Sequence, residues 1–359
     1  MQKKTVAFSK NSSNLFFHIL TKCNLACSHC YINKEQHGEN TLDIKTIKEW
    51  LALFAGKKKD VTNLKTQAAN PDGSDLESQS INVIFLGGEP TLHQDLAPAV
   101  KEAKRLGFKS ITIDTNGYLF HNILNRITPD EVDFISFSLD GATKETNDAI
   151  RGKGCFDNCV AGIKEAVSKG FSTSMIYTVS KDNIHELAMM PEIIKKLGIK
   201  RFFIQVIGIR GESADESGTS QVSKEKWLET VPKVAREVAQ YGITVTYPKV
   251  FLEKGEEFQC AGLVADNYFI FPNARVYRCP ICEDYPMHSL EIKDNRLVQT
   301  DKINEDDLFR LTIPEGCVMN KLIQPGNLSY NNDGTPRHRI ACCMLKEEIS
   351  TLYEGFQNL

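Results

Sequence analysis

The chain has 359 residues, of which 41% are hydrophobic, and its formal net charge is −3. This length suffices for one large folded unit and a smaller one, and the charge excludes the basic surface that nucleic-acid-binding proteins use. No apolar stretch approaches the length of a membrane span, and no apolar segment follows the N-terminal lysines. We therefore expect a cytoplasmic protein with neither nucleic acid nor a membrane as its partner.

Strand-like and helix-like segments alternate along the first part of the chain. The strand-like segments are 15–20, 81–86, 110–114, 132–139, 173–179 and 202–207. Helical patterns lie at 44–54, 96–106, 156–168 and 184–197. Six such units predict an α/β fold, with a parallel sheet covered by helices and a ligand site at the C-terminal ends of the strands.

The predicted organisation has three parts. Residues 1–210 form the strand–helix repeat, which the polar segment 56–80 interrupts. We expect this segment to be a mobile insertion, with a lid as the alternative. Residues 211–257 are predicted to form a connector, a helix at 224–241 and a strand at 243–247. Residues 258–359 are rich in cysteine and are predicted to form a smaller C-terminal domain.

The chain holds 11 cysteines, three of which follow the first strand as Cys23, Cys27 and Cys30, a CxxxCxxC motif. Disulfides are rare in reducing compartments, so ligation of a metal or a cluster explains these residues better. Iron–sulfur clusters prefer thiolates, and three cysteines leave one iron of a [4Fe–4S] cluster open for chemistry. The alternative is a zinc site with His29 as fourth ligand, although His29 stands between two of the cysteines and would crowd them.

A second motif, Gly87-Gly88-Glu89-Pro90, follows the second strand. Two glycines allow the backbone to approach a ligand closely, and Glu89 supplies a carboxylate. By itself this motif is also compatible with an ordinary turn. At this distance after CxxxCxxC, the pair of motifs resembles the radical S-adenosylmethionine (SAM) enzymes. The resemblance implies a partial (βα)6 TIM-like barrel over about residues 15–208.

The resemblance also implies roles for individual residues. Cys23, Cys27 and Cys30 would hold a [4Fe–4S] cluster whose open iron is chelated by SAM. Gly87, Gly88 and Glu89 would receive the methionyl amino group, and the backbone at His29 would lie beside the adenine. The predicted barrel mouth supplies further cofactor-binding candidates, namely Asn116, Ser138, Asp140 and Gln205.

Some of these candidates also have a simpler interpretation. Asp140 is suited to a ribose hydroxyl, but it could equally cap a turn. Asn116 precedes a glycine and could belong to a plain turn. Arg151 is expected either to meet an anionic group or to lie in a surface loop. Cys155 and Cys159, four residues apart at a helix start, are expected to be small buried side chains, with a redox pair as the alternative.

Six further cysteines lie in the C-terminal part of the chain, namely Cys260, Cys279, Cys282, Cys317, Cys342 and Cys343. The CxxC at Cys279 resembles the SPASM and twitch extensions of radical SAM enzymes. Ala274 replaces the glycine of that pattern, and no cysteine follows Cys282 before Cys317. We therefore expect one auxiliary [4Fe–4S] cluster, held by Cys260, Cys279, Cys282 and one of the last three cysteines. Two clusters or a zinc knuckle are the alternatives.

The resemblance implies an enzyme that cleaves SAM reductively to a 5′-deoxyadenosyl radical, which then abstracts a hydrogen atom from the substrate. We expect oxidation or cross-linking of a peptide or protein side chain, since such extensions often accompany that chemistry. A flavodoxin or ferredoxin would donate the electron. The alternatives are a small-molecule dehydrogenase, a nucleotide-rearranging enzyme of cofactor biosynthesis, or an iron–sulfur electron-transfer protein.

Overall fold

A computed structural model describes residues 2–6, 12–55, 80–215, 220–302 and 304–350. The polar insertion predicted at 56–80 therefore lies outside the described residues, except for Ser80, the first residue of a strand. Within the described ranges, no helix is both long enough and apolar enough to cross a membrane.

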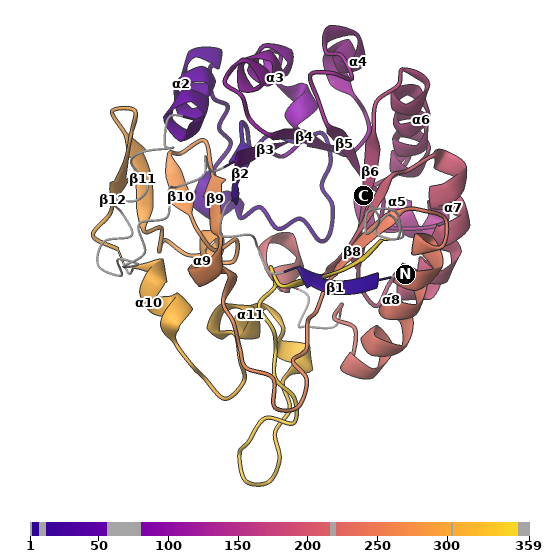
Figure 1. Cartoon of the computed structure of the whole chain (residues 1–359), viewed down its shortest axis with the longest axis vertical. Coiled ribbons are helices and arrows are strands. Elements are labelled where there is room, and N and C mark those ends of the chain that lie inside the picture. Colours follow the sequence, from indigo (N-terminus) through magenta and orange to yellow (C-terminus); the bar gives the residue numbers. More distant parts are fainter. Residues whose placement is uncertain (1, 7–11, 56–79, 216–219, 303, 351–359) are drawn as a thin grey trace, which may run out of the picture.

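Six parallel strands form the centre of the fold, in the order in which they occur along the chain. They are β2 (Ser12–His18), β3 (Ser80–Leu86), β4 (Ser110–Thr115), β5 (Phe134–Ser138), β6 (Thr173–Val179) and β7 (Arg201–Val206). The helices between them are α2 (Ile44–Ala55), α3 (Leu96–Arg105), α4 (Ile123–Arg126), α5 (Lys144–Arg151), α6 (Cys155–Ser168) and α7 (Met190–Leu197). Figure 1 shows the strands curving around an interior, with α2, α3, α4, α6 and α7 outside them. This is the predicted α/β partial barrel.

The burial pattern explains why these segments form strands of a barrel. Ile111, Ile113 and Thr115 of β4 are buried, while the residues between them are partly exposed. Alternation of this kind places one face of the strand under the helices and the other face toward the barrel interior. In α3, the buried Ala99, Val100 and Ala103 share one side of the helix, which covers the sheet.

The sheet continues beyond the barrel strands, to a total of 13 strands in the described part of the chain. After β7 it adds β8 (Thr244–Pro248) in parallel, then β13 (Lys346–Ser350) and β1 (Gln2–Val6) in antiparallel pairing. On the other side β9 (Asp266–Ile270) pairs in parallel with β2. The antiparallel strands β10 (Arg275–Tyr277), β11 (Leu290–Lys293) and β12 (Arg296–Gln299) follow it.

The remaining helices connect and cover these strands. They are α1 (Lys34–His37), α8 (Lys224–Ala239), α9 (Ala261–Val264), α10 (Glu305–Arg310) and α11 (Val318–Ile323). In Figure 1, α9, α10 and α11 lie together beside β9 and β10. The cysteine-rich C-terminal part is therefore joined to the barrel through a shared sheet.

Most predicted elements agree with the structure to within one or two residues, and β6 agrees at both ends. Three differences concern helices of the barrel, and one is that the short helix α4 was not predicted. The predicted helix 184–197 is a 3₁₀ segment, Ile184–Met189, followed by α7, which has a proline in its first turn. The helix α5 was not predicted, and it makes Arg151 the last residue of a buried helical turn instead of part of a surface loop.

Candidate functional site

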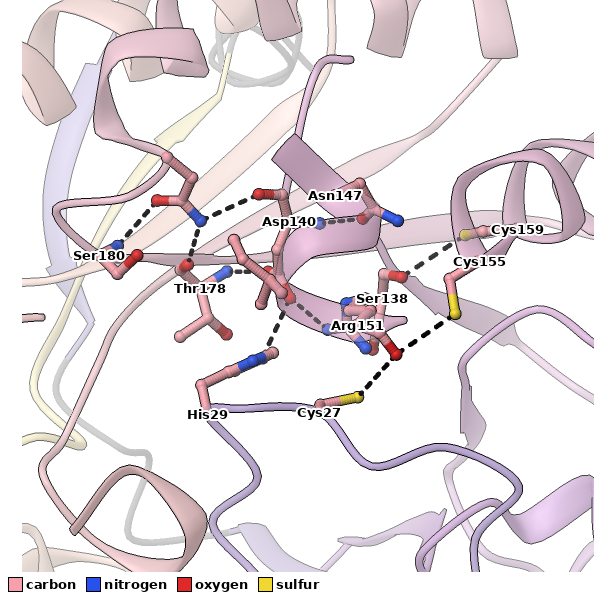
Figure 2. A network of polar contacts seen from close by, with 12 residues as sticks. Cys27, His29, Ser138, Asp140, Asn147, Arg151, Cys155, Cys159, Thr178 and Ser180 are labelled. Atoms are coloured by element: carbon pink, nitrogen blue, oxygen red, sulfur yellow. Dashed lines mark hydrogen bonds and ion pairs between the residues drawn. The ribbon is translucent and has the colours of Figure 1, made fainter. Parts of the chain in front are cut away.

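The loop between β2 and α1 carries Cys23, Cys27 and Cys30, and it follows the C-terminal end of a barrel strand. The Ser28 N–H donates a hydrogen bond to the Ile150 carbonyl oxygen at 3.0 Å. The Cys27 Sγ lies 3.9 Å from the Arg151 carbonyl oxygen. The cysteine loop is thereby held against the last turn of α5 (Figure 2).

The three thiols lie close enough to influence one another's ionisation. Burial raises the pKa of Cys27 to about 12, and Cys30 and Cys23 add to this effect while Arg151 opposes it. Burial likewise raises the pKa of Cys23 and of Cys30. A neighbouring metal ion removes the proton from such a thiol outright. Three adjacent sulfur atoms on one short loop therefore fit the iron–sulfur cluster that the motif predicts.

The two glycines of the second motif let β3 approach the cysteine loop. The Gly88 N–H donates to the Leu20 carbonyl oxygen at 3.1 Å, and the Glu89 N–H donates to the Lys22 carbonyl oxygen at 3.0 Å. A Cβ atom on Gly88 would lie 2.3 Å from that Lys22 oxygen, and one on Gly87 would lie 2.6 Å from the Leu20 oxygen. Only glycine fits between these backbones, so the motif fixes the position at which the cysteine loop begins.

Glu89 is fully buried and links the ends of β3 and β4. Its Oε1 accepts hydrogen bonds from the Thr91 N–H at 3.0 Å, the Thr91 hydroxyl at 2.6 Å and the Thr115 hydroxyl at 2.8 Å. Its Oε2 accepts one from the Asn116 N–H at 2.7 Å. Burial raises the pKa of Glu89, although these hydrogen bonds oppose the shift. The carboxylate thus has a structural role that the sequence did not indicate.

Asn116 lies directly beside the first cysteine. Its Nδ2 donates to the Asn24 Oδ1 at 2.8 Å and lies 3.9 Å from the Cys23 Sγ. The structure therefore places this residue at the mouth of the barrel, as predicted, although its partner is the cysteine loop.

Asp140 is buried at the end of β5 and is the centre of a charged network (Figure 2). Its Oδ2 lies 2.6 Å from the Arg151 Nη2 and 3.0 Å from the His29 Nε2, while its Oδ1 accepts from the Thr178 N–H at 2.6 Å. Burial by itself raises the pKa of Asp140, but Arg151 and His29 outweigh it and bring the pKa to about 2. The network connects the cysteine loop to β5, β6 and α5.

Cys155 and Cys159 are both buried, as expected for small apolar side chains. The Cys155 Sγ points to the Arg151 carbonyl oxygen at 3.4 Å, and the Cys159 Sγ points to the Ser138 carbonyl oxygen at 3.5 Å. Figure 2 shows Cys27 and Cys155 directed at the same carbonyl oxygen. These two cysteines pack α6 against the network.

Gln205 lies on β7 in register with Thr178 of β6. Its side chain is exposed, whereas Phe202 and Ile204 on the opposite face of the strand are buried. A small hollow lies beside the cysteine loop and is lined by Ser28, His29, Ile150, Thr178, Ser180, Asp182, Ile207 and Ser220. The hollow and Gln205 thus lie at neighbouring strand ends.

The structure brings the six C-terminal cysteines together. They come from the start of α9, the turn after β10, the start of α11 and the segment before β13. One hollow is lined by Cys260, Cys279, Cys317, Cys342 and Cys343. The sixth, Cys282, forms a hydrogen bond with the Cys279 thiol.

Cys342 lies at the centre of this group. Hydrogen bonds from the thiols of Cys260, Cys317 and Cys343 lower its pKa, and the same contacts raise the pKa of each of these three partners. Within the described part of the chain, no three His, Cys, Asp or Glu side chains are arranged as ligands of a single metal ion. In a [4Fe–4S] cluster, by contrast, each thiolate binds a different iron.

The turn that carries Cys279 is held by Glu305, which sequence reasoning missed. This buried carboxylate accepts hydrogen bonds from the Arg278 N–H at 3.0 Å, the Cys279 N–H at 2.9 Å and the Ser289 hydroxyl at 2.6 Å. No local pattern marks Glu305, because it lies 26 residues beyond Cys279 and meets it only in the folded protein.

Comparison with known proteins agrees with this geometry. Residues 18–194 match the model of the Radical SAM superfamily. A probable GTP 3′,8-cyclase of Saccharolobus islandicus is 27% identical over 199 residues, which are 55% of this chain and 58% of the relative. An Fe-coproporphyrin III synthase of Methanosarcina barkeri is 27% identical over 242 residues, which are 66% of this chain and 55% of the relative. The matches thus span less than two thirds of these relatives.

Two solved structures share the fold over most of the chain. Native anSMEcpe with bound AdoMet (SAM) has a TM-score of 0.60 and 12% identity, and the match covers 87% of this chain and 88% of that one. SuiB of Streptococcus suis bound to its precursor peptide SuiA has a TM-score of 0.57 and 15% identity, covering 89% and 65%. At this identity the likeness concerns the fold.

Proposed function

We propose that this chain, whose residues 18–194 match the model of the Radical SAM superfamily, is a radical SAM enzyme that oxidises or cross-links a side chain of a peptide or protein substrate. Cys23, Cys27 and Cys30 would hold a [4Fe–4S] cluster, which would supply the electron for reductive cleavage of SAM and thereby the means of removing a hydrogen atom from the substrate. The protein's own residues bind the cofactors, orient the substrate and exclude water. A flavodoxin or ferredoxin is the proposed electron donor.

Cys23, Cys27 and Cys30 would ligate the cluster, and the surrounding contacts hold their loop in place. The glycine pair fixes the start of the loop, and the Asp140 network fixes its middle through His29. Restraint at both points keeps the three sulfur atoms in one arrangement before the cofactor binds. Such pre-organisation reduces the entropy cost of binding.

The SAM contacts remain predictions, and the structure gives a physical basis for some of them. Oε2 of Glu89 accepts a hydrogen bond from the Asn116 N–H, and the second lone pair of this oxygen could accept one from the methionyl ammonium group. The hollow beside His29 and Thr178 is the proposed adenine site, with Gln205 at the neighbouring strand end. Both oxygens of Asp140 are engaged by protein groups, so we favour a positioning role for this residue over a ribose contact.

We further propose that the C-terminal cysteines hold an auxiliary [4Fe–4S] cluster, which would bind substrate or accept an electron as product forms. Support comes from the five thiols that line one hollow and from the sixth, Cys282, which is hydrogen-bonded to Cys279. In a variant with Cys23, Cys27 and Cys30 replaced by Ala, the reconstituted protein should retain iron and sulfide. Its absorbance should bleach with dithionite, because an iron–sulfur cluster can be reduced. A bound zinc ion would show no such change, since zinc has no redox chemistry. One zinc and no iron in that variant would contradict the proposal.

The proposal of a peptide substrate rests on the second group of cysteines, which lies in the C-terminal part. That part is joined to the barrel through the pairing of β9 with β2. Solved structures that share this fold over most of the chain include SuiB bound to its precursor peptide and anSMEcpe with a bound peptide. The second candidate is a small-molecule enzyme of cofactor biosynthesis. It is favoured by the matched relatives, a GTP cyclase and a coproporphyrin synthase.

One experiment distinguishes the two candidates. The reconstituted enzyme is incubated anaerobically with SAM and dithionite, together with either the protein fraction or the small-molecule fraction of a cell extract. Mass spectrometry should show a new mass in the protein fraction, and the variant lacking the first three cysteines should not produce it. A change confined to the small-molecule fraction would refute the peptide proposal and support the cofactor enzyme.

A further inference from the structure

One short segment after β7 contacts both cysteine sites. On one side, the Glu212 N–H donates to the Cys30 carbonyl oxygen at 2.9 Å. Gly211, with φ of +55°, passes so close to this loop that a Cβ atom would lie 2.3 Å from the same oxygen. The guanidinium carbon of Arg210 lies 5.0 Å from the centre of the Tyr31 ring, within the range of a cation–π contact.

On the other side, Arg210 contacts the turn that carries Cys279 and Cys282. Its Nη1 donates to the Pro280 carbonyl oxygen at 2.6 Å and lies 3.5 Å from the Asp284 Oδ2. Its Nη2 lies 2.9 Å from the Glu283 Oε1. Each partner adjoins a cysteine or lies within two residues of one.

All three ionisable side chains of this contact are shielded from water. The exposed fractions are 13% for Arg210, 1% for Glu283 and 10% for Asp284. A buried guanidinium with several fixed partners allows little movement, because its planar fork of donors demands a defined geometry. A lysine would keep the charge but could not reproduce that fork.

We propose that Arg210 is a positioning residue that fixes the loop carrying Cys30 relative to the turn carrying Cys279 and Cys282. It thereby sets the separation between the SAM site and the auxiliary site. The consequence for catalysis rests on the proposed function, because it requires cofactors at both sites. The contact between the two segments does not depend on the proposed function. The contact and the proposed function can therefore be refuted separately.

The connection is tested first in metal-free protein. Amide hydrogen exchange is followed by mass spectrometry in wild type, Arg210→Lys and Arg210→Met, with Arg201→Lys as the control. Arg201 is also an arginine of this part of the chain, but it lies at the start of β7, where its guanidinium carbon is 4.1 Å from the centre of the Phe134 ring, at the strand end opposite the barrel mouth. In both Arg210 variants, exchange in 28–34 and 279–284 should rise together by about tenfold or more, because losing one partner of a buried ion pair releases both sides.

The catalytic consequence is tested in reconstituted enzyme by EPR and product analysis. Arg210→Lys should retain the wild-type iron content but alter the magnetic coupling between the two reduced clusters. It should also yield several-fold more 5′-deoxyadenosine per modified substrate, whereas Arg201→Lys should do neither. If Arg210→Met leaves exchange in both segments unchanged, or if Arg201→Lys has the same effects, Arg210 does not connect the sites. If the C-terminal site binds no iron, the proposal of an auxiliary cluster is refuted. The hydrogen-exchange result still shows whether Arg210 connects the two segments.

Discussion

Replacing Asp140 by Asn should destabilise the protein and loosen the cysteine loop. The substitution keeps the size of the side chain but removes the negative charge that faces Arg151 at 2.6 Å and His29 at 3.0 Å. It leaves a buried guanidinium without a counter-charge, since Arg151 is itself buried. The hydrogen bond from the Thr178 N–H can be kept by the amide oxygen.

The magnitude follows from the pKa and from the unpaired charge. The pKa of Asp140 falls from an ordinary value of 3.8 to about 2, which corresponds to about 2.4 kcal/mol in favour of the charged form. Removing one partner of a buried ion pair costs about 3–5 kcal/mol. We therefore expect a loss of about 2–5 kcal/mol. Because the folded pKa is the lower one, this stabilisation is complete above about pH 3.8 and disappears as the pH falls through about 2.

The assay is urea unfolding of the metal-free protein at pH 7, together with the alkylation rate of Cys27 measured by mass spectrometry. Asp157→Asn is the control, because that residue forms an exposed ion pair with Lys144 and should cost less than about 1 kcal/mol. Adding Arg151→Met to Asp140→Asn should restore part of the lost stability, since no unpaired charge remains. A loss below about 0.5 kcal/mol with an unchanged alkylation rate would refute this reasoning.

Three further predictions concern the same region. Gly88→Ala places a Cβ 2.3 Å from the Lys22 carbonyl oxygen. It should lower the free energy of unfolding by about 1–3 kcal/mol and reduce iron loading at the first cysteine site. An unchanged urea midpoint and iron content would contradict this. Glu89→Gln should weaken SAM binding by about 1.5–3 kcal/mol in equilibrium dialysis, and equal affinity would leave Glu89 a purely structural role. Burial lowers the pKa of His18 to about 3, so its neutral form stabilises the folded state above pH 6.5. This contribution falls by about 2 kcal/mol between pH 7 and pH 5. The His18→Gln variant should lack that fall in unfolding free energy, and the same pH dependence in both proteins would contradict this prediction.

The sequence by itself determined the barrel and the first cysteine site. Both depend on features that lie within a few residues of one another. The strand-like segments 110–114 and 173–179 indicated β4 and β6, and the three cysteines of CxxxCxxC share one loop in any fold of this kind. Because parallel strands end at the same edge, the order of the strands also placed Asn116 and Asp140 at the barrel mouth.

The partners at that mouth could not be predicted in the same way. The sequence offered a ribose contact or a turn cap for Asp140, whereas the structure pairs it with Arg151 and His29. The helix that buries Arg151 is short and strongly polar, so its pattern resembles a surface loop. Its burial is caused by the cysteine loop that packs onto it, which is a tertiary contact.

The C-terminal part shows the same limit most clearly. The sequence contains six cysteines in this part, but only the folded chain brings five of them to one hollow, where Cys260 meets Cys342 and Cys343 across about 80 residues. The pairing of β9 with β2 likewise joins residues more than 250 positions apart. Arg210 carried no motif at all, and its position between the two cysteine sites exists only because β7 ends there. Local patterns predict local structure, whereas contacts between distant segments depend on which surfaces the folded sheet and its helices bring together.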